Sequence, residues 1–317
     1  MLPQAALEFY ASQQAVSITV RNEVRRLWRR MGDDFDASWR RVGPSVLTVI
    51  AEGQAQMALK ARDYNHDVLE ALDIPDHPEG ELIPDSLVGV ASDGRPLDTL
   101  AAQSVVTAKA TIADGGTTQQ GLDAGGQWAQ LMAQLQVADA ARVAVGIGAA
   151  SRRNIAGHVR VLNPPVCQRC AILGGRFYRW STGFNRHPRD DCTMMPVKSE
   201  PWAESNSVLF DPDAAYKAGQ IKDITEAQAK AIAEGADLTE VVNAYRGMST
   251  TATQRVIQRT NFGPVSVQPG MPDILGSLST LPRATGEARL TPEGIYQAAG
   301  ADRGEAIRLL QRHGYIT

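Results

Sequence analysis

The chain has 317 residues, of which 43% are hydrophobic and 21% charged, and its formal net charge is −3. This near balance of charge favours neither a nucleic-acid nor a membrane partner, and no apolar run reaches the roughly 18 residues that a membrane-spanning helix needs. Three cysteines cannot build a disulfide framework, and the length suffices for two or three compact units. Glu8 is acidic and no basic residue precedes Arg21, so we expect no secretory signal at the N-terminus.

Hydrophobic periodicity predicts long helices in the N-terminal half. Apolar residues recur at spacings of three and four within residues 4–31, 36–72, 97–113 and 117–151. Pro44 either starts the regular part of the second helix or kinks it. The links are short, which favours antiparallel packing of successive helices. Because alanine-rich stripes bury little area per residue, we expect these helices to pack against other subunits as well as each other.

The pattern changes near residue 158. Residues 158–162 and 176–180 each alternate apolar and polar side chains, which predicts two short strands. Cys167 and Cys170 lie between them, followed by the turn-forming pair 174–175. The sequence therefore predicts a β-hairpin that carries a CxxC motif at its knuckle.

The cysteines carry the strongest chemical signal. They form the series Cys167-x2-Cys170-x16-His187-x4-Cys192, in which a CxxC pair and two later ligands could close a tetrahedron around one ion. Three sulfurs and an imidazole suit zinc, and four protein ligands leave no open position for a reactive water, so the predicted role is structural. The alternative is an accidental turn with reduced, buried thiols. A redox CxxC is disfavoured, because such motifs usually open a helix in a βαβ setting.

The residues around this cluster carry a resemblance. Asn163–Cys170, Gly175–Phe177 and Arg186–Pro188 resemble the phage Mu F-like head morphogenesis (minor capsid) family, as found in tailed phages of actinobacteria. That family shows a CxxC followed by His-Pro-x-Cys-x-Cys, and its module would cover about residues 100–200. Two further stretches, Gly235–Gly247 and Leu290–Tyr315, are similar to relatives from the same phages.

The resemblance implies a virion component that is made beside the portal protein and packaged in few copies inside the head. It implies a role in head assembly or DNA passage, with host cytoplasm as the location before assembly. The chain departs from the family pattern at Asp190, which stands where the first late cysteine would be. Either His187 completes the site, or Asp190 substitutes as an oxygen ligand, or the metal is lost and packing alone holds the hairpin. We favour His187, with Asp190 as an outer or substitute ligand.

Basic residues are segregated beside the cysteines. From Arg142 to Arg189 there are nine arginines, no lysine and no acidic residue. Arginine grips phosphate in a fixed fork, and Tyr178 and Trp180 could add stacking. We therefore predict sequence-independent contact with packaged double-stranded DNA, or alternatively neutralisation of the thiolates and of an acidic neighbour. The predicted DNA-contacting set is Arg152, Arg153, Arg160, Arg169, Arg176, Arg179, Arg186 and Arg189.

Short helices are predicted again after about residue 213. Thr225 and Asp237 each begin one with a capping-box arrangement. Residues 248–288 are rich in Ser, Thr, Gly and Pro, which indicates an extended arm or linker. Two short helices close the chain, the first capped by Thr291 and the second covering about residues 302–312.

Together these patterns predict a mostly α fold of long antiparallel helices, with an inserted small zinc-knuckle β-hairpin and a C-terminal helical arm. The predicted units are a helical domain (1–151), the zinc-binding hairpin module (152–200), a helical segment (201–247), the arm or linker (248–288) and the helical tail (289–317).

The predicted function is structural: a minor capsid protein that is present in several copies and contacts the portal protein or major capsid protein. No enzyme is expected, because no Ser/His/Asp or metalloprotease arrangement stands out. A capsid maturation protease is the alternative, and no membrane partner is expected.

Overall fold

The computed structural model describes residues 2–182, 192–244, 248–250, 256–258, 280–282 and 288–317. Within them the protein is mostly helical, as predicted, with a small three-stranded antiparallel sheet and three two-stranded pairings. None of the helices in these ranges combines the length and apolar character needed to cross a bilayer.

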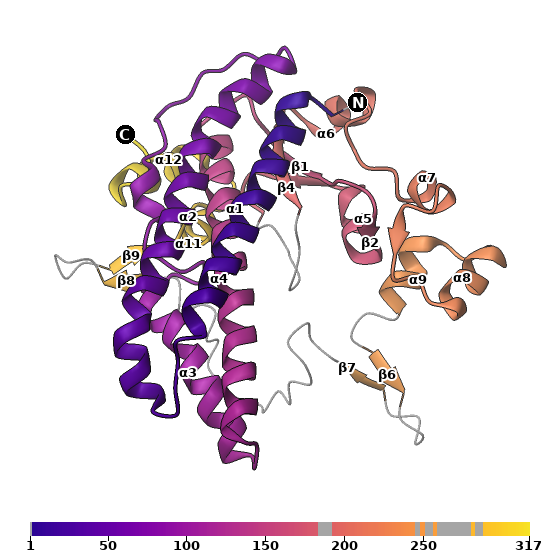
Figure 1. Cartoon of the computed structure of the whole chain (residues 1–317). Helices are drawn as coiled ribbons and strands as arrows, with labels where there is room; N and C mark the ends of the chain where they lie inside the picture. The colour runs from indigo at the N-terminus through magenta and orange to yellow at the C-terminus, as the bar shows by residue number, and fades with distance from the viewer. Residues whose placement is uncertain (1, 183–191, 245–247, 251–255, 259–279, 283–287) are drawn as a thin grey trace.

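Long helices form the body of the molecule, and their positions agree with the hydrophobic periodicity (Figure 1). They are α1 (Gln4–Trp28), α2 (Phe35–Ala71), α3 (Leu97–Ala113) and α4 (Thr118–Ala150). The Asp34 side chain caps α2, and a capping box between Thr117 and Gln120 begins α4. Helix α2 runs through Pro44 without ending.

Helix α4 packs against the other three long helices. Trp28, at the end of α1, donates from its Nε1 to the carbonyl of Leu122 at 2.8 Å. Its ring lies over Gly125 and Gly126 of α4, where an added Cβ would come within 2.7 Å of ring atoms. Small residues in α4 therefore let the helices approach closely.

A three-stranded antiparallel sheet covers one end of the helical body. It contains β1 (Gly157–Val161), β3 (Phe177–Arg179) and β4 (Thr193–Val197) in the order β3-β1-β4. The two strands predicted from alternation do pair, with His158 opposite Tyr178. The Tyr64 hydroxyl of α2 donates to the Met194 carbonyl at 3.0 Å, which ties the sheet to the helices.

The predicted hairpin knuckle is wrong: the CxxC opens a helix, so the reason given for disfavouring a redox CxxC, that such motifs open a helix, does not hold. Strand β2 (Val166–Cys167) leads directly into α5 (Gln168–Gly174). Cys167 has extended backbone angles and its sulfur accepts the backbone N–H of Cys170, so it acts as the helix N-cap. Sequence patterns do not predict this cap, since Ser, Thr, Asp and Asn are the usual capping residues.

Short helices follow the sheet. Strand β5 (Ile221–Lys222), which lies among them, pairs in parallel with β2, the strand that directly precedes α5. The Thr225 capping box is present, and Asp237 accepts from the backbone N–H of Glu240. These helices are α6 (Glu200–Ser205), α7 (Pro212–Lys217), α8 (Glu226–Ala233) and α9 (Leu238–Ala244).

Most of the predicted linker 248–288 lies outside the described residues. Its described fragments are paired strands: β6 (Met248–Thr250) pairs with β7 (Val256–Gln258), and β8 (Thr280–Pro282) pairs with β9 (Ala288–Leu290).

The C-terminal helices α11 (Pro292–Ala299) and α12 (Arg303–Arg312) do not form a separate arm. Ile295, Leu310 and Tyr315 belong to the same buried core as α1–α4. The chain end also bonds to the segment that follows α2, where the backbone N–H of Ile83 donates to the Tyr315 carbonyl at 2.8 Å. A short 3-10 helix, η1 (Pro84–Leu87), begins there. The boundaries expected at residues 151 and 289 therefore do not separate independent cores.

Candidate metal centre and its basic surroundings

The structure brings the three cysteines into one small core. Cys170 and Cys192 are buried, Cys167 is half-buried, and none is in a disulfide. Apolar side chains from the segment after β1, from β2 and α5, and from later segments surround them, namely Leu162, Val166, Ala171, Phe210 and Ile221. Three elements position the sulfurs: Cys167 ends β2 and caps α5, Cys170 lies within α5, and Cys192 directly precedes β4.

Hydrogen-bond donors point at two of these sulfurs. The backbone N–H of Cys170 donates to Cys167 Sγ at 3.2 Å, and Arg160 Nη1 donates to Cys192 Sγ at 3.0 Å. A guanidinium beside a sulfur stabilises the thiolate over the thiol, and the thiolate is the form that binds metals. Arg142 adds a bond from its Nε to the Cys192 carbonyl at 2.9 Å.

The ion pair behind Cys192 was not predicted. Arg142 and Asp139 both lie on α4 and are buried, and Arg142 Nη1 is 3.0 Å from Asp139 Oδ1. Their spacing of three residues on a helix is the only sequence signal that could have indicated this pair. It fixes the guanidinium that holds the Cys192 carbonyl.

Zinc fits these donors in kind, since soft thiolates are its preferred ligands. Within the described part of the chain, however, no three His, Cys, Asp or Glu side chains are arranged as a metal-binding group. Four residues of the predicted sites lie outside that part, namely Arg186, His187, Arg189 and Asp190. The ligand set of the three cysteines with His187 therefore stays a prediction.

His158 lies on β1 and not among the predicted ligands. It is buried, and its ring stacks on that of Tyr178 with centroids 5.5 Å apart. Burial, together with the positive charge of Arg160, lowers the pKa of His158 to about 3. The imidazole is therefore neutral at physiological pH.

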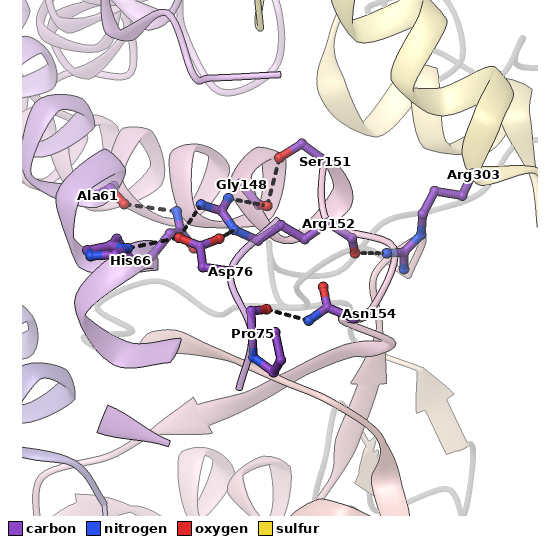
Figure 2. Close-up of polar contacts among 10 residues, drawn as sticks. Ala61, His66, Pro75, Asp76, Gly148, Ser151, Arg152, Asn154 and Arg303 are labelled. Atoms are coloured by element: carbon purple, nitrogen blue, oxygen red, sulfur yellow. Dashed lines mark hydrogen bonds and ion pairs between the residues drawn. The ribbon is translucent and has the colours of Figure 1, made fainter. Parts of the chain in front are cut away.

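Two predicted DNA-contacting arginines are buried, which corrects that part of the prediction. Arg152 is 4% exposed and Arg160 1%. Arg152 pairs with Asp76 and donates to the Gly148 carbonyl at 2.8 Å (Figure 2). The Arg160 guanidinium lies 5.2 Å from the centre of the Tyr178 ring. Because phosphate contact needs a surface guanidinium, neither side chain can serve it in this fold.

The other described arginines of the set are nearer the surface. Arg169 is half-buried and donates to an amide oxygen, Asn243 Oδ1, at 3.1 Å. Arg153 is exposed and pairs with Glu79. Arg176, just before β3, and Arg179, the last residue of β3, are exposed.

A polar network joins the end of α4 to its neighbours (Figure 2). Asp76 accepts from Arg152 and lies 3.0 Å from His66 Nδ1 on α2. Arg303, from α12, donates to the Arg152 carbonyl. Nothing in the sequence connects Arg303 with residues 151 positions away, so sequence reasoning could not find this contact.

The Asp76 hydrogen bond raises the pKa of His66. For Asp76 itself, burial is the largest single influence and raises the pKa. The hydrogen bonds and charges of Arg152 and His66 together outweigh burial, so the pKa of Asp76 is lowered overall.

Comparison with known proteins identifies no relative: no protein-family model, curated protein or solved structure matches the chain.

Proposed function

We propose that the chain is a structural minor capsid protein of a tailed phage. It lies inside the head, near the portal or the capsid shell, and assists assembly and DNA packaging or ejection. The observation that carries the proposal is the placement of the segment with the family resemblance. Asn163–Cys170 and Cys192 meet in one small core, beside a buried arginine and against a large helical body.

A structural zinc ion is part of this proposal. Cys167, Cys170 and Cys192 would hold it, and His187 would complete the set, with Asp190 as the substitute ligand. The ion would supply cohesion that this small core lacks, since its buried apolar members are few. Arg160 would offset part of the negative charge that three thiolates bring.

Elemental analysis of the purified, reduced protein tests the zinc proposal. We expect about one zinc per chain in the wild type, and loss of that zinc in the Cys167→Ser/Cys170→Ser variant. His187→Gln should weaken retention against a chelator, whereas His77→Gln, an exposed histidine in another part of the chain, should not. Wild-type protein that binds no zinc and still folds cooperatively would contradict the proposal.

Assembly with capsid components tests the function. Co-expression with the portal and major capsid proteins of the same phage should yield particles that contain the chain. Sedimentation of the chain with those particles supports the proposal, and its absence from them counts against it. Specific cleavage of the major capsid protein, abolished by one side-chain change, would instead favour the maturation protease.

A further inference from the structure

A groove of about 640 Å³ lies between the sheet and the start of α12. Three guanidiniums line it, from Arg153, Arg179 and Arg303, together with Trp180, Phe177 and one carboxylate, Glu200. We call it the arginine groove. It gathers segments that are far apart in the sequence, since Arg153 follows α4, Arg179 ends β3 and Arg303 begins α12.

Arg303 is held rigidly at the wall of this groove. Its Nη1 donates to the Arg152 carbonyl, its Nη2 donates to the Ile155 carbonyl at 2.5 Å, and its guanidinium lies 4.7 Å from the centre of the Trp180 ring. These contacts fix the orientation of the charge before any ligand arrives, which reduces the entropy that binding must cost.

The positive charge in the groove is only partly compensated. Arg153 pairs with Glu79, but within the described ranges neither Arg179 nor Arg303 forms an ion pair with a carboxylate. Burial and, after it, repulsion from Arg153 lower the pKa of Arg303 to about 10. An anion in the groove would relieve that repulsion.

Two aromatic residues named for base stacking, Tyr178 and Trp180, already have partners in this structure. Arg303 covers one face of Trp180, and the Trp180 and Tyr296 rings meet edge to face at 5.9 Å. Tyr178 of β3 is buried and stacks on His158. The groove therefore offers guanidinium groups to an anion, while the Tyr178 ring and one face of Trp180 are already occupied.

We propose that the arginine groove binds the phosphates of the duplex DNA backbone, through Arg179, Arg303 and Arg153. This inference rests on the proposed function, which places the chain beside packaged DNA. The sequence predicts a broad basic surface, whereas the arginine groove has only three arginines. One of them, Arg303, lies outside the arginine-rich segment. Binding of this kind is independent of sequence and depends steeply on salt.

Fluorescence anisotropy with a labelled 24-base-pair duplex of random sequence, titrated at several salt concentrations, tests the inference on the full chain. Arg179→Ala removes an exposed side chain and should not disturb folding. Each lost phosphate contact should flatten the slope of log affinity against log salt by about 0.9 and weaken binding about five- to tenfold near 0.1 M salt. Arg153→Ala/Arg179→Ala should flatten it further.

Arg308→Ala is the matched control, because it removes one arginine from α12 at a position that is exposed and outside the groove. Its affinity and slope should equal those of the wild type. Equal losses from Arg308→Ala and Arg179→Ala would overturn the inference, as would absence of DNA binding at low salt.

Equal competition by polyglutamate at matched charge would also overturn it, and would assign the groove to an acidic protein surface. None of these outcomes decides whether the chain is in the virion, so the proposed function is tested separately.

Discussion

Buried arginines dominate the chemistry at the scale of single residues. Arg142, Arg152 and Arg160 are each less than 5% exposed. Arg142 donates to Asp139 and Arg152 to Asp76, while Arg160 donates to Cys192 Sγ. A buried charge is tolerated only with such partners, and removal of one partner leaves the other uncompensated.

The Asp76–Arg152 pair gives the first prediction at this scale. Asp76→Asn should lower the free energy of unfolding by about 3 kcal/mol, because it leaves the buried guanidinium of Arg152 without its carboxylate. Urea denaturation measures this change. Asp63→Asn is the control, since Asp63 pairs with Arg62 on the surface, and it should change stability by less than about 1 kcal/mol. Equal effects of the two variants would contradict this assignment.

The same network predicts a dependence on pH. The pKa of His66 is raised in the folded state, so protonated His66 stabilises the fold. This contribution to the free energy of unfolding is complete below about pH 6.5, the pKa of an unperturbed histidine. It is lost as the pH rises through the pKa of His66 in the folded protein. Asp76 has a lowered pKa, so its contribution is present above its ordinary pKa and is lost as pH falls through the folded value.

Urea denaturation of wild type and His66→Gln across pH measures this. The wild type should be the more stable of the two in acid, and the difference should vanish in alkaline buffer. A stability difference between the two proteins that grows with pH would show that the pKa of His66 is lowered, and not raised, by folding.

Residue types alone could not reveal which arginines are buried. The sequence correctly located the arginine-rich segment, but Arg152 and Arg160 are held inside by partners from distant segments, Asp76 and Cys192. Arginine serves equally well in a buried pair and on a phosphate. Only the fold distinguishes the two uses.

Among the elements, the long helices were predictable and the cysteine segment was not. Helices α1 to α4 follow from sustained periodicity with clear boundaries, for example the Thr117 cap of α4. Helix α5 is only seven residues long, and a cysteine caps it, so neither length nor capping residue indicated a helix. The clustering of Cys192 with the CxxC depends on the pairing of β1 with β4, which periodicity does not specify.

Close helix packing gives a prediction at the element scale. Gly125→Ala should destabilise the protein by about 1–3 kcal/mol. The added Cβ would lie 2.7 Å from the Ser104 carbonyl oxygen and 2.7 Å from a Trp28 ring atom. Gly146→Ala, in the same helix, has only Met194 Cε nearby, at 3.8 Å. It should stabilise by about 0.5–1 kcal/mol, because alanine is the better helix former.

Thermal or urea unfolding of both variants checks this pair. Stabilisation by Gly125→Ala would show that α3 and α4 are not packed as closely as described.

At the scale of the whole molecule, one core includes both ends of the chain. Phe9 of α1 stacks on Tyr64 with ring centroids 4.1 Å apart, and Ile295, Leu310 and Ile316 from the C-terminal region lie in the same buried cluster. The tail was predicted as an arm because its helices are short and follow a stretch with weak periodicity. Contacts between segments so distant in sequence leave no local signal.

Removal of residues 289–317 should therefore abolish cooperative thermal unfolding. Each large apolar side chain lost from the core costs about 2–5 kcal/mol, and the total exceeds the marginal stability of a typical domain. Circular dichroism against temperature measures this, with Arg308→Ala, an exposed position on α12, as the control. A truncated chain that melts within about 3 °C of the full chain would show that the tail is independent after all.

The most direct test of the account is the protein composition of purified particles of the tailed phage that is proposed to encode this chain. Quantitative mass spectrometry should find the chain at a fixed ratio far below that of the major capsid protein, and protease added to intact heads should not reach it. Absence from particles, despite abundance in the infected cell, would contradict the assignment as a minor capsid protein.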